Sequence, residues 1–269
     1  MKLGSLRWLL IVIGLHAASA YPVESVIAEQ GTRVENLSAT IRKAGAWLGP
    51  SADFEVVGRV AWLLGGDNTL VDLGSGKRIL PKGFVVHAFA RTAEGTVAVI
   101  TENVLGIITR GVFLPTTRLP FGNMRVAAGP GESVLLFGGP QDDQHLIRYD
   151  GERHATLLRV SSPIGVVTHA AERIFLTAGN KLYTVRPGES PALLFLFPDG
   201  SEITGLAVNT RKGEIFVATA DAVFVLDRGV AEKKLAGLGG RLQWRDGYLY
   251  VLDPVHSIFA RVRFVGNGN

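Results

Sequence analysis

The chain has 269 residues, of which 47% are hydrophobic and 19% charged, and it contains no cysteine. This composition excludes a disordered chain, and the lack of cysteine excludes a disulfide scaffold, a cysteine-ligated metal and a thiol nucleophile. The formal net charge is +4, and without Lys2 and Arg7 it is +2, from 26 basic and 24 acidic residues. The charge balance therefore does not indicate nucleic-acid binding.

The first twenty residues have the three parts of a secretory signal peptide. Lys2 and Arg7 are followed by an apolar run at 8–15, and the small residues Ala18-Ser19-Ala20 end just before Tyr21. The apolar run is shorter than the roughly 20 residues that a membrane span needs. We expect cleavage after residue 20, which leaves a secreted or periplasmic protein with no membrane span; an uncleaved N-terminal anchor is the alternative.

From residue 53 onward, one unit of short apolar strands and tight polar turns recurs. The clearest strand of each unit starts 37, 37, 40, 41 and 34 residues after the previous one. These strands are predicted at 60–64, 97–101, 134–138, 174–178, 215–219 and 249–253. A second strand follows each of them, at 69–73, 104–109, 145–149, 181–185, 222–226 and 257–262. Further apolar runs lie before and after these pairs, so each unit holds four strands in about 40 residues.

A four-stranded unit repeated at this period predicts a β-propeller. A single small sheet cannot cover both of its faces, and radial stacking buries each sheet between two neighbours. The strands are almost continuously apolar, which fits sheets that are buried on both faces. The sequence therefore predicts an all-β, six-bladed propeller of four-stranded antiparallel blades, with sandwich arrays and other blade counts as alternatives.

The two ends of the chain suggest how the ring closes. The sixth unit, from about residue 241, ends one strand short, so a strand within 23–28 or 34–41 is predicted to complete it and remove an exposed sheet edge. A short helix is expected near 37–48. The expected organisation is a signal peptide at 1–20, an N-terminal segment with the closing strand at 21–52, the propeller at 53–265 and a tail at 266–269.

The fifth unit carries a resemblance to a known group of proteins. Its residues Ile203-Thr204-Gly205-Leu206-Ala207-Val208-Asn209 and Gly213-Glu214-Ile215-Phe216-Val217-Ala218-Thr219 resemble a repeat of the six-bladed NHL-repeat, SMP-30/gluconolactonase-like and strictosidine-synthase-like propellers. The resemblance implies the fold. For the lactonases of that group it also implies one divalent cation, commonly calcium, held by Glu, Asn and Asp residues at the inner edges of the blades.

The metal pattern implied by this resemblance is only partly present. The Asn that precedes an innermost strand is matched by Asn123, and Thr204 takes that place in the fifth unit. The Asp at the end of the next strand is matched by Asp221 and Asn180. A full Glu/Asn/Asn/Asp set is not evident. Under this alternative, the resemblance implies a metal held by Asn123, Asn180 and Asp221.

Polar residues at the turns form the second candidate site. In a propeller, the turns after the predicted strands lie on the same face as the connections between blades, so their side chains would ring the mouth of the channel. The candidates are Asp67, Glu102, Asn123, Asn180, Thr204, Asp221, Asp253 and Arg241. Convergent oxygens could bind a cation or a polar ligand; the alternative is that Asn and Asp shape tight turns. His87 and His169 fall on predicted innermost strands and could also face the channel.

Two functions follow from this sequence. The first is a secreted or periplasmic, non-catalytic propeller without a cofactor, which binds a protein, peptide or glycan partner through its loop-bearing face. The second is a lactonase- or esterase-like hydrolase that uses Ca²⁺ or another divalent cation at the central channel. The sequence favours the first because it shows no complete catalytic set, but it leaves open whether the chain is an enzyme.

Overall fold

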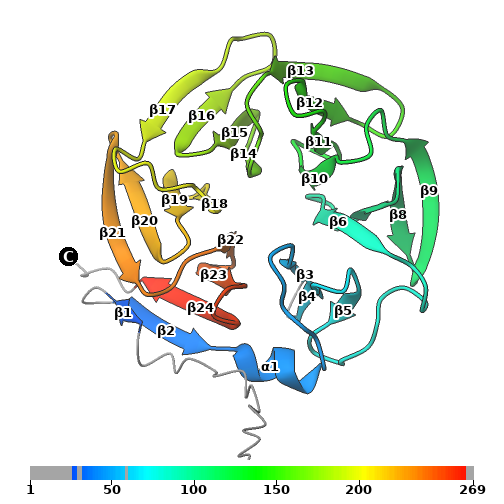
Figure 1. The fold of residues 1–269 in the computed structure, drawn as a ribbon, viewed down its shortest axis with the longest axis horizontal. Helices are drawn as coiled ribbons and strands as arrows, with labels where there is room; N and C mark the ends of the chain where they lie inside the picture. The colour runs from blue at the N-terminus through cyan, green and yellow to red at the C-terminus, as the bar shows by residue number, and fades with distance from the viewer. Residues whose placement is uncertain (1–25, 29–31, 58–59, 265–269) are drawn as a thin grey trace, which may run out of the picture.

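The computed structural model describes residues 26–28, 32–57 and 60–264. Six antiparallel sheets are arranged around a central axis, each with one strand innermost and the others side by side outward from it (Figure 1). The predicted all-β six-bladed propeller is confirmed. The predicted signal peptide lies outside the described residues.

Blades 2 to 5 each contain four consecutive strands. Blade 2 consists of β6 (Val86–Arg91), β7 (Val97–Thr101), β8 (Val104–Thr109) and β9 (Val112–Arg118). Blade 3 consists of β10 (Arg125–Ala128), β11 (Val134–Gly138), β12 (Gln144–Tyr149) and β13 (His154–Val160). Blade 4 consists of β14 (Val167–Ala170), β15 (Arg173–Ala178), β16 (Lys181–Val185) and β17 (Ala192–Leu196). Blade 5 consists of β18 (Gly205–Asn209), β19 (Glu214–Ala218), β20 (Ala222–Asp227) and β21 (Val230–Ala236).

Blade 6 is completed from the N-terminal part of the chain, as predicted. It consists of β22 (Arg241–Arg245), β23 (Tyr248–Asp253) and β24 (Ile258–Phe264), with β2 (Thr32–Asn36) as its outer strand. A shorter strand, β1 (Ile27–Ala28), pairs with β21 and gives blade 5 a fifth strand. The predicted closing range 34–41 was therefore only partly right, because its second half is the helix α1 (Ser38–Lys43).

Blade 1 departs from the predicted four strands. It consists of β3 (Asp53–Val57), β4 (Val60–Leu64) and β5 (Leu70–Asp72), and the fourth position is reduced to an isolated bridge between Val71 and Arg78. The short helix α1 lies outside this blade (Figure 1). The hairpin turn at 74–76 approaches the helix so closely that a Cβ at Gly76 would lie 3.5 Å from Cα of Ala44. Ile41 of the helix shares a buried cluster with Leu63 of β4 and Phe259 of β24, so the helix packs at the seam between blades 1 and 6.

The hydrophobic core lies between the blades rather than within one layer. Ile100 of blade 2 and Leu136 of blade 3 are completely buried in one such seam. In the seam between blades 5 and 6, the rings of Phe216 and Trp244 stack with their centroids 5.1 Å apart. Because every sheet is buried on both faces, the strands carry apolar residues at consecutive positions, which is the pattern seen in the sequence.

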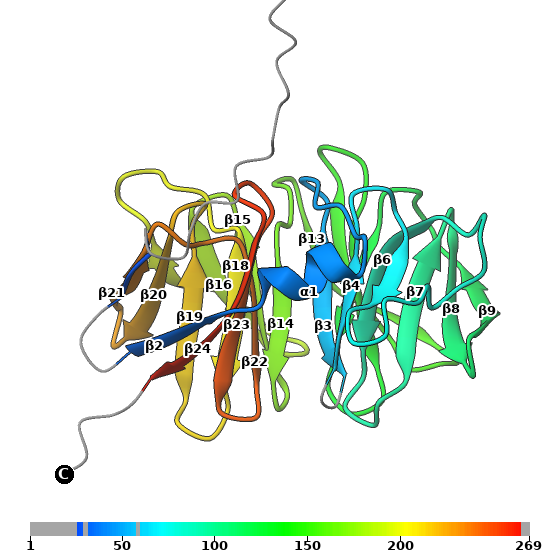
Figure 2. The ribbon, with the colours of Figure 1, turned by 90° about the horizontal axis from the view of Figure 1, so that it is seen from below.

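Edge-on, the molecule has two different faces (Figure 2). The connections between blades and the turns between the second and third strands lie on one face, which we call the loop-bearing face; the hairpins between the first and second strands lie on the opposite face. An innermost strand therefore starts at the loop-bearing face and ends at the opposite face. Within the described residues, no helix is long and apolar enough to cross a membrane.

Candidate functional site

The six innermost strands surround a central cavity of about 470 Å³. A smaller hollow of about 260 Å³ lies at its loop-bearing end, and Arg125 and Arg241 line both. Since side chains alternate along a strand, every second residue of each innermost strand faces the cavity. In β22 those residues are Arg241, Gln243 and Arg245, and in β3 they include Asp53 and Glu55. Charged and amide side chains therefore line the channel at β3 and β22, whereas residues such as Phe89 and Leu206 line it elsewhere.

At the loop-bearing end, two arginines are anchored across the blade seams. Arg125 Nη1 donates to the Gly165 carbonyl at 2.8 Å, and Arg241 Nη1 donates to the Thr204 carbonyl at 3.0 Å. Burial lowers the pKa of Arg125, and the neighbouring Arg241 charge lowers it further. The Asp53 carboxylate opposes these two effects on the pKa. Each guanidinium has five N–H groups and donates only one hydrogen bond to the described residues. The unused guanidinium donors of the two arginines can bind an anion.

Glu55 lies in the middle of the channel and differs from an ordinary carboxylate. Its Oε2 accepts a hydrogen bond from Gln243 Nε2, and Gln243 Oε1 accepts one from the Val56 amide at 2.7 Å. Burial and the nearby charge of Asp53 raise the pKa of Glu55 to about 8, against smaller opposing effects of Gln243, the Arg91 backbone and Arg245. Glu55 is therefore mostly uncharged at neutral pH, and it does not neutralise the arginines around it.

The opposite end of the channel holds a second pair of arginines, at the last positions of their strands. Arg91 ends β6 and Arg245 ends β22, and both line the cavity together with Thr92. His169 also lines this end, as the sequence allowed; its Nδ1 lies 3.1 Å from the Ala128 carbonyl oxygen, and burial lowers its pKa. The other sequence candidate, His87, is exposed and does not line the cavity.

Three of the eight residues predicted at the mouth line it. Arg241, Thr204 and Asp253 line the hollow at the loop-bearing end. Asp253 is completely buried, and its Oδ1 accepts hydrogen bonds from the amides of Val255 and His256, both at 3.0 Å. Its Oδ2 lies 2.8 Å from Nδ1 of His256. Asp253 thus holds its turn in place, and Arg241 is the predicted residue that offers free donors to a ligand.

The other predicted residues do not line the cavity or the hollow, and four of them serve their own turns. Asp67 accepts a hydrogen bond from the Thr69 hydroxyl at 2.9 Å, and Asp221 accepts one from the Thr219 hydroxyl at 2.9 Å. Asn180 Nδ2 donates to the Phe197 carbonyl at 2.9 Å. Glu102 has a φ of 51°, the left-handed conformation of a tight turn. These contacts fit the alternative reading of these residues, in which Asn and Asp shape turns.

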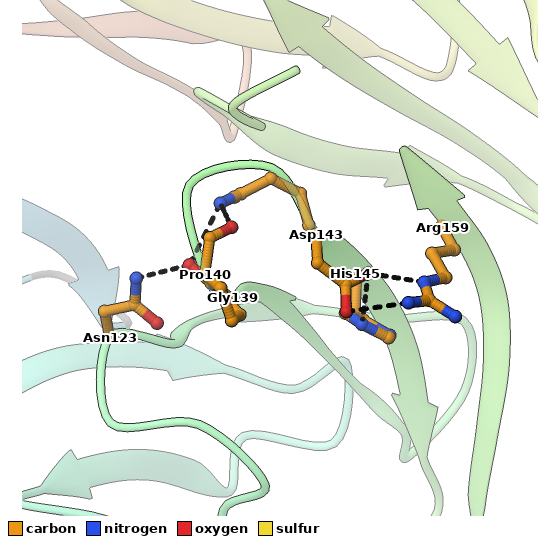
Figure 3. A network of polar contacts seen from close by, with 7 residues as sticks. Asn123, Gly139, Pro140, Asp143, His145 and Arg159 are labelled. Carbon is orange, nitrogen blue, oxygen red and sulfur yellow. Dashed lines mark hydrogen bonds and ion pairs between the residues drawn. The ribbon is translucent and has the colours of Figure 1, made fainter. Parts of the chain in front are cut away.

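Asn123 is also held by local contacts (Figure 3). Its side-chain amide donates to the Gly139 carbonyl, which also accepts a hydrogen bond from Gln144 Nε2 at 3.0 Å. In the same loop, the Asp143 carboxylate pairs with Arg159 and lies 3.0 Å from Nε2 of His145. The Arg159 hydrogen bond is the main cause that lowers the pKa of Asp143. This network orders the loop between β11 and β12.

The residues present do not fit the divalent cation implied by the resemblance. Over the described ranges, no three His, Asp or Glu side chains come together in a way that could hold a metal ion. Asn123 and Asn180 donate their side-chain amides to carbonyls, and Asp221 accepts from Thr219. None of the three lines the cavity or the hollow, so they do not converge on the channel. The start of the innermost strands, where the implied ligands would lie, instead presents Arg125 and Arg241. Hard cations require several converging oxygen ligands, commonly carboxylates, whereas the carboxylates of this hollow, Glu202 and Asp253, stand beside two arginines, and Asp253 is held by its own turn.

Most of the charged and amide residues that line the channel were not predicted from the sequence. The residues that were not predicted are Asp53, Glu55, Arg91, Arg125, Gln243 and Arg245. A signal was present, since polar residues alternate in Asp53-Phe54-Glu55 and in Arg241-Leu242-Gln243-Trp244-Arg245. Alternation marks two faces of a strand, but it does not say which face points into the channel, because a shift of one residue exchanges them.

Comparison with known proteins identifies the fold. No protein-family model and no curated protein sequence matches the chain. Among solved structures, it is similar to the calcium-binding protein regucalcin from Agrobacterium tumefaciens (14% identity, TM-score 0.64, 83% of this chain and 92% of that one). It is also similar to a gluconolactonase from Xanthomonas campestris (11% identity, TM-score 0.62, 92% and 93%). A structure of a nidogen/laminin complex matches too (15% identity, TM-score 0.57, 75% and 84%).

These similarities confirm the resemblance to SMP-30/gluconolactonase-like propellers at the level of the fold. The three proteins include a calcium-binding protein, an enzyme and part of a complex between proteins, so one architecture carries unrelated activities. The function of this chain has to be argued from its own channel.

Proposed function

We propose that this protein is a non-catalytic propeller that binds an anionic group of a protein, peptide or glycan partner at the loop-bearing mouth of its channel. The observation that carries the proposal is the pair Arg125 and Arg241, which face one hollow with most of their donors unused. The ligand class follows from the geometry of the guanidinium, which matches a carboxylate, sulfate or phosphate through two parallel hydrogen bonds.

The surroundings of the two arginines support a built site. The Arg125 guanidinium lies 5.0 Å from the centre of the Phe137 ring, and its hydrogen bond to the Gly165 carbonyl fixes it from the other side. Arg241 is held by its hydrogen bond to the Thr204 carbonyl. Side chains that are already ordered lose little conformational entropy on binding. Pro254 and Val255 give the hollow an apolar rim, and Val255 is 74% exposed, so the mouth combines charged donors with an accessible apolar contact.

We further propose that the protein acts outside the cytoplasm, in the secreted or periplasmic space. The basis is the signal-peptide pattern of the first twenty residues. N-terminal sequencing of the protein recovered from the medium or periplasm should begin at Tyr21. Recovery only in the cytoplasmic fraction with Met1 intact would contradict this part of the proposal.

Binding of acidic probes to the mature protein, residues 21–269, tests the main proposal. Two fluorescent probes separate the sources of the anion: a hexaglutamate peptide and an oligogalacturonate. We expect saturable binding of at least one probe, and we expect Arg241→Gln and Arg125→Gln to weaken it about tenfold or more, because each removes charge-assisted hydrogen bonds. The matched control is Arg118→Gln, an exposed arginine that ends β9 at the same face.

Two results would contradict the proposal. One is the absence of saturable binding of either probe at low ionic strength. The other is equal weakening by Arg118→Gln and by the two mouth variants, which would indicate a diffuse surface charge instead of a site. Addition of CaCl₂ to the same assay tests the hydrolase alternative, since a cation that occupied the mouth would change probe binding at stoichiometric concentration.

A further inference from the structure

The far end of the channel contains an unusual concentration of unsatisfied polar atoms. Four buried side-chain nitrogen or oxygen atoms of the described chain have no hydrogen-bond partner: Arg91 Nε, Thr92 Oγ1, Arg245 Nε and His145 Nε2. The histidine lies 3.0 Å from the Asp143 carboxylate in an ion pair. The remaining three all belong to residues that line one end of the cavity. Buried polar groups are nearly always hydrogen-bonded, so three exceptions at one place call for a partner.

The two arginines come from strands on either side of β3. The Arg91 backbone and the Arg245 charge both act on Glu55, which places this residue between them. The Arg91 side chain lies over its own hairpin, so that a Cβ at Gly95 would come within 3.0 Å of its Nη2. Neither guanidinium donates a hydrogen bond to another described residue, in contrast to Arg125 and Arg241. Arg91 and Arg245 are thus positioned by the fold without being hydrogen-bonded by it.

The electrostatic balance at this end is also incomplete. The groups that face Glu55 are Asp53 of its own strand, Arg91 of β6, and Gln243 and Arg245 of β22. Because Glu55 is mostly protonated at neutral pH, Asp53, two residues nearer the mouth on β3, is the one charged carboxylate among these groups. One carboxylate does not balance the two half-buried arginines, so they carry a desolvation cost that a bound anion would offset.

We infer that Arg91, Thr92 and Arg245 form a second binding site, for a small oxyanion such as sulfate, phosphate or the carboxylate of a small acid. The two guanidinium groups would donate to the oxygens of the anion, and the Thr92 hydroxyl would add a third donor. The site is separate from the mouth, because Arg241 and Arg245 are four residues apart on one strand, which is about 13 Å. The absence of this site would therefore not contradict the proposed function, and the absence of binding at the mouth would not contradict this site.

Titration with sodium sulfate tests this inference, since sulfate does not change its own charge between pH 6 and 9.5. Isothermal titration is carried out on the mature wild-type protein and on Arg91→Gln, Arg245→Gln and Thr92→Val. We expect each arginine variant to lose one of the sulfate sites or to weaken it about tenfold or more, and Thr92→Val to weaken it less. The matched control is Arg211→Gln, an exposed arginine in the β18–β19 turn on the same face.

The mouth variants make the two sites distinguishable. Arg241→Gln should remove the binding of the acidic probes and leave the sulfate site at the far end. If sulfate binding is lost in Arg241→Gln and unchanged in Arg91→Gln and Arg245→Gln, the second site is refuted while the mouth stands. If Arg91→Gln and Arg245→Gln both keep the number and the affinity of the wild-type sulfate sites, the bound sulfate is an adventitious ion only and the inference is wrong.

The pH dependence of the sulfate affinity tests the inference even if the arginine variants do not fold. As the pH rises through about 8, Glu55 becomes charged and competes with the anion for Arg245. Sulfate affinity of the wild type should therefore fall above pH 8, whereas Glu55→Gln should keep its affinity up to pH 9.5. An identical pH profile in the two proteins would overturn the inference.

Discussion

The two ends of the channel present the same kind of side chain in different states. At the loop-bearing mouth, Arg125 and Arg241 each donate a hydrogen bond to a carbonyl of the adjacent blade. At the opposite end, Arg91 and Arg245 donate none to the residues that the structure describes, and their Nε atoms are buried without a partner. An arginine with a backbone partner contributes to the fold even without a ligand. The mouth pair therefore contributes to the fold as well as to the proposed binding site, whereas the fold does not use the side-chain donors of the pair at the opposite end.

The largest expected effect concerns Glu55, which lies between the two ends. In the unfolded chain Glu55 loses its proton near its ordinary pKa of 4.5, whereas in the folded protein the proton is kept until about pH 8. The unfolded state therefore binds fewer protons between these values, and the free energy of unfolding should fall by about 1.4 kcal/mol per pH unit as the pH rises.

Urea unfolding at pH 5.5 and 7.5 measures this slope. Glu55→Gln should lose the contribution, while Glu94→Gln, an exposed acid in the β6–β7 hairpin, should retain it. Equal pH dependence in Glu55→Gln and the wild type would show that the carboxyl is not protonated in the folded state.

The second large effect is the difference in stability cost when a Cβ is added at each end of the channel. A Cβ at Gly205, at the mouth, would overlap the backbone oxygen of Gly240, and Gly205→Ala should cost about 3 kcal/mol of stability. At the opposite end, a Cβ at Gly95 meets the movable end of the Arg91 side chain. The φ of Gly95 is +97°, so Gly95→Ala should cost about 1 kcal/mol, mainly from backbone strain. Chemical denaturation of both variants tests the order; the reverse order would contradict the described packing.

The smallest effect compares the two ends of β22 directly. Arg241→Gln should destabilise the protein by about 1 kcal/mol, because the hydrogen bond to the Thr204 carbonyl is lost. In a buffer without sulfate or phosphate, Arg245→Gln should leave the melting temperature unchanged or raise it, since it removes an uncompensated charge. Differential scanning calorimetry gives both values. A clear loss of stability in Arg245→Gln would mean that this arginine has a structural partner.

The fold could be predicted from the sequence because its determinants are local. Apolar runs such as 97–101 and 134–138, separated by turns with Gly and charged residues, specify hairpins, and their period specifies blades. The closing strand followed from the missing strand of the sixth unit. The reduced blade 1 was not predicted, because the segment after β5 pairs with it through one bridge, Val71 with Arg78, and the apolar pattern does not distinguish a single bridge from a short strand.

The residues of the site were harder to predict from the sequence than the fold. Asp67, Asn180 and Asp221 were chosen because polar residues in turns resemble ligands, but their hydrogen bonds serve the turns. Arg241 was named, yet Arg245 on the same strand was not. Which of two alternating faces points to the axis depends on the register of the whole blade, and the unusual pKa of Glu55 depends on burial and on neighbours from three strands.

The central claim is that the channel of this propeller is an anion site, although its fold is similar to that of a calcium-binding protein. The most direct test is calorimetric titration of the same mature protein with sodium sulfate and with calcium chloride at constant ionic strength. We expect saturable sulfate binding that requires the channel arginines, and no saturable calcium binding. Stoichiometric calcium binding together with no sulfate binding would contradict the claim.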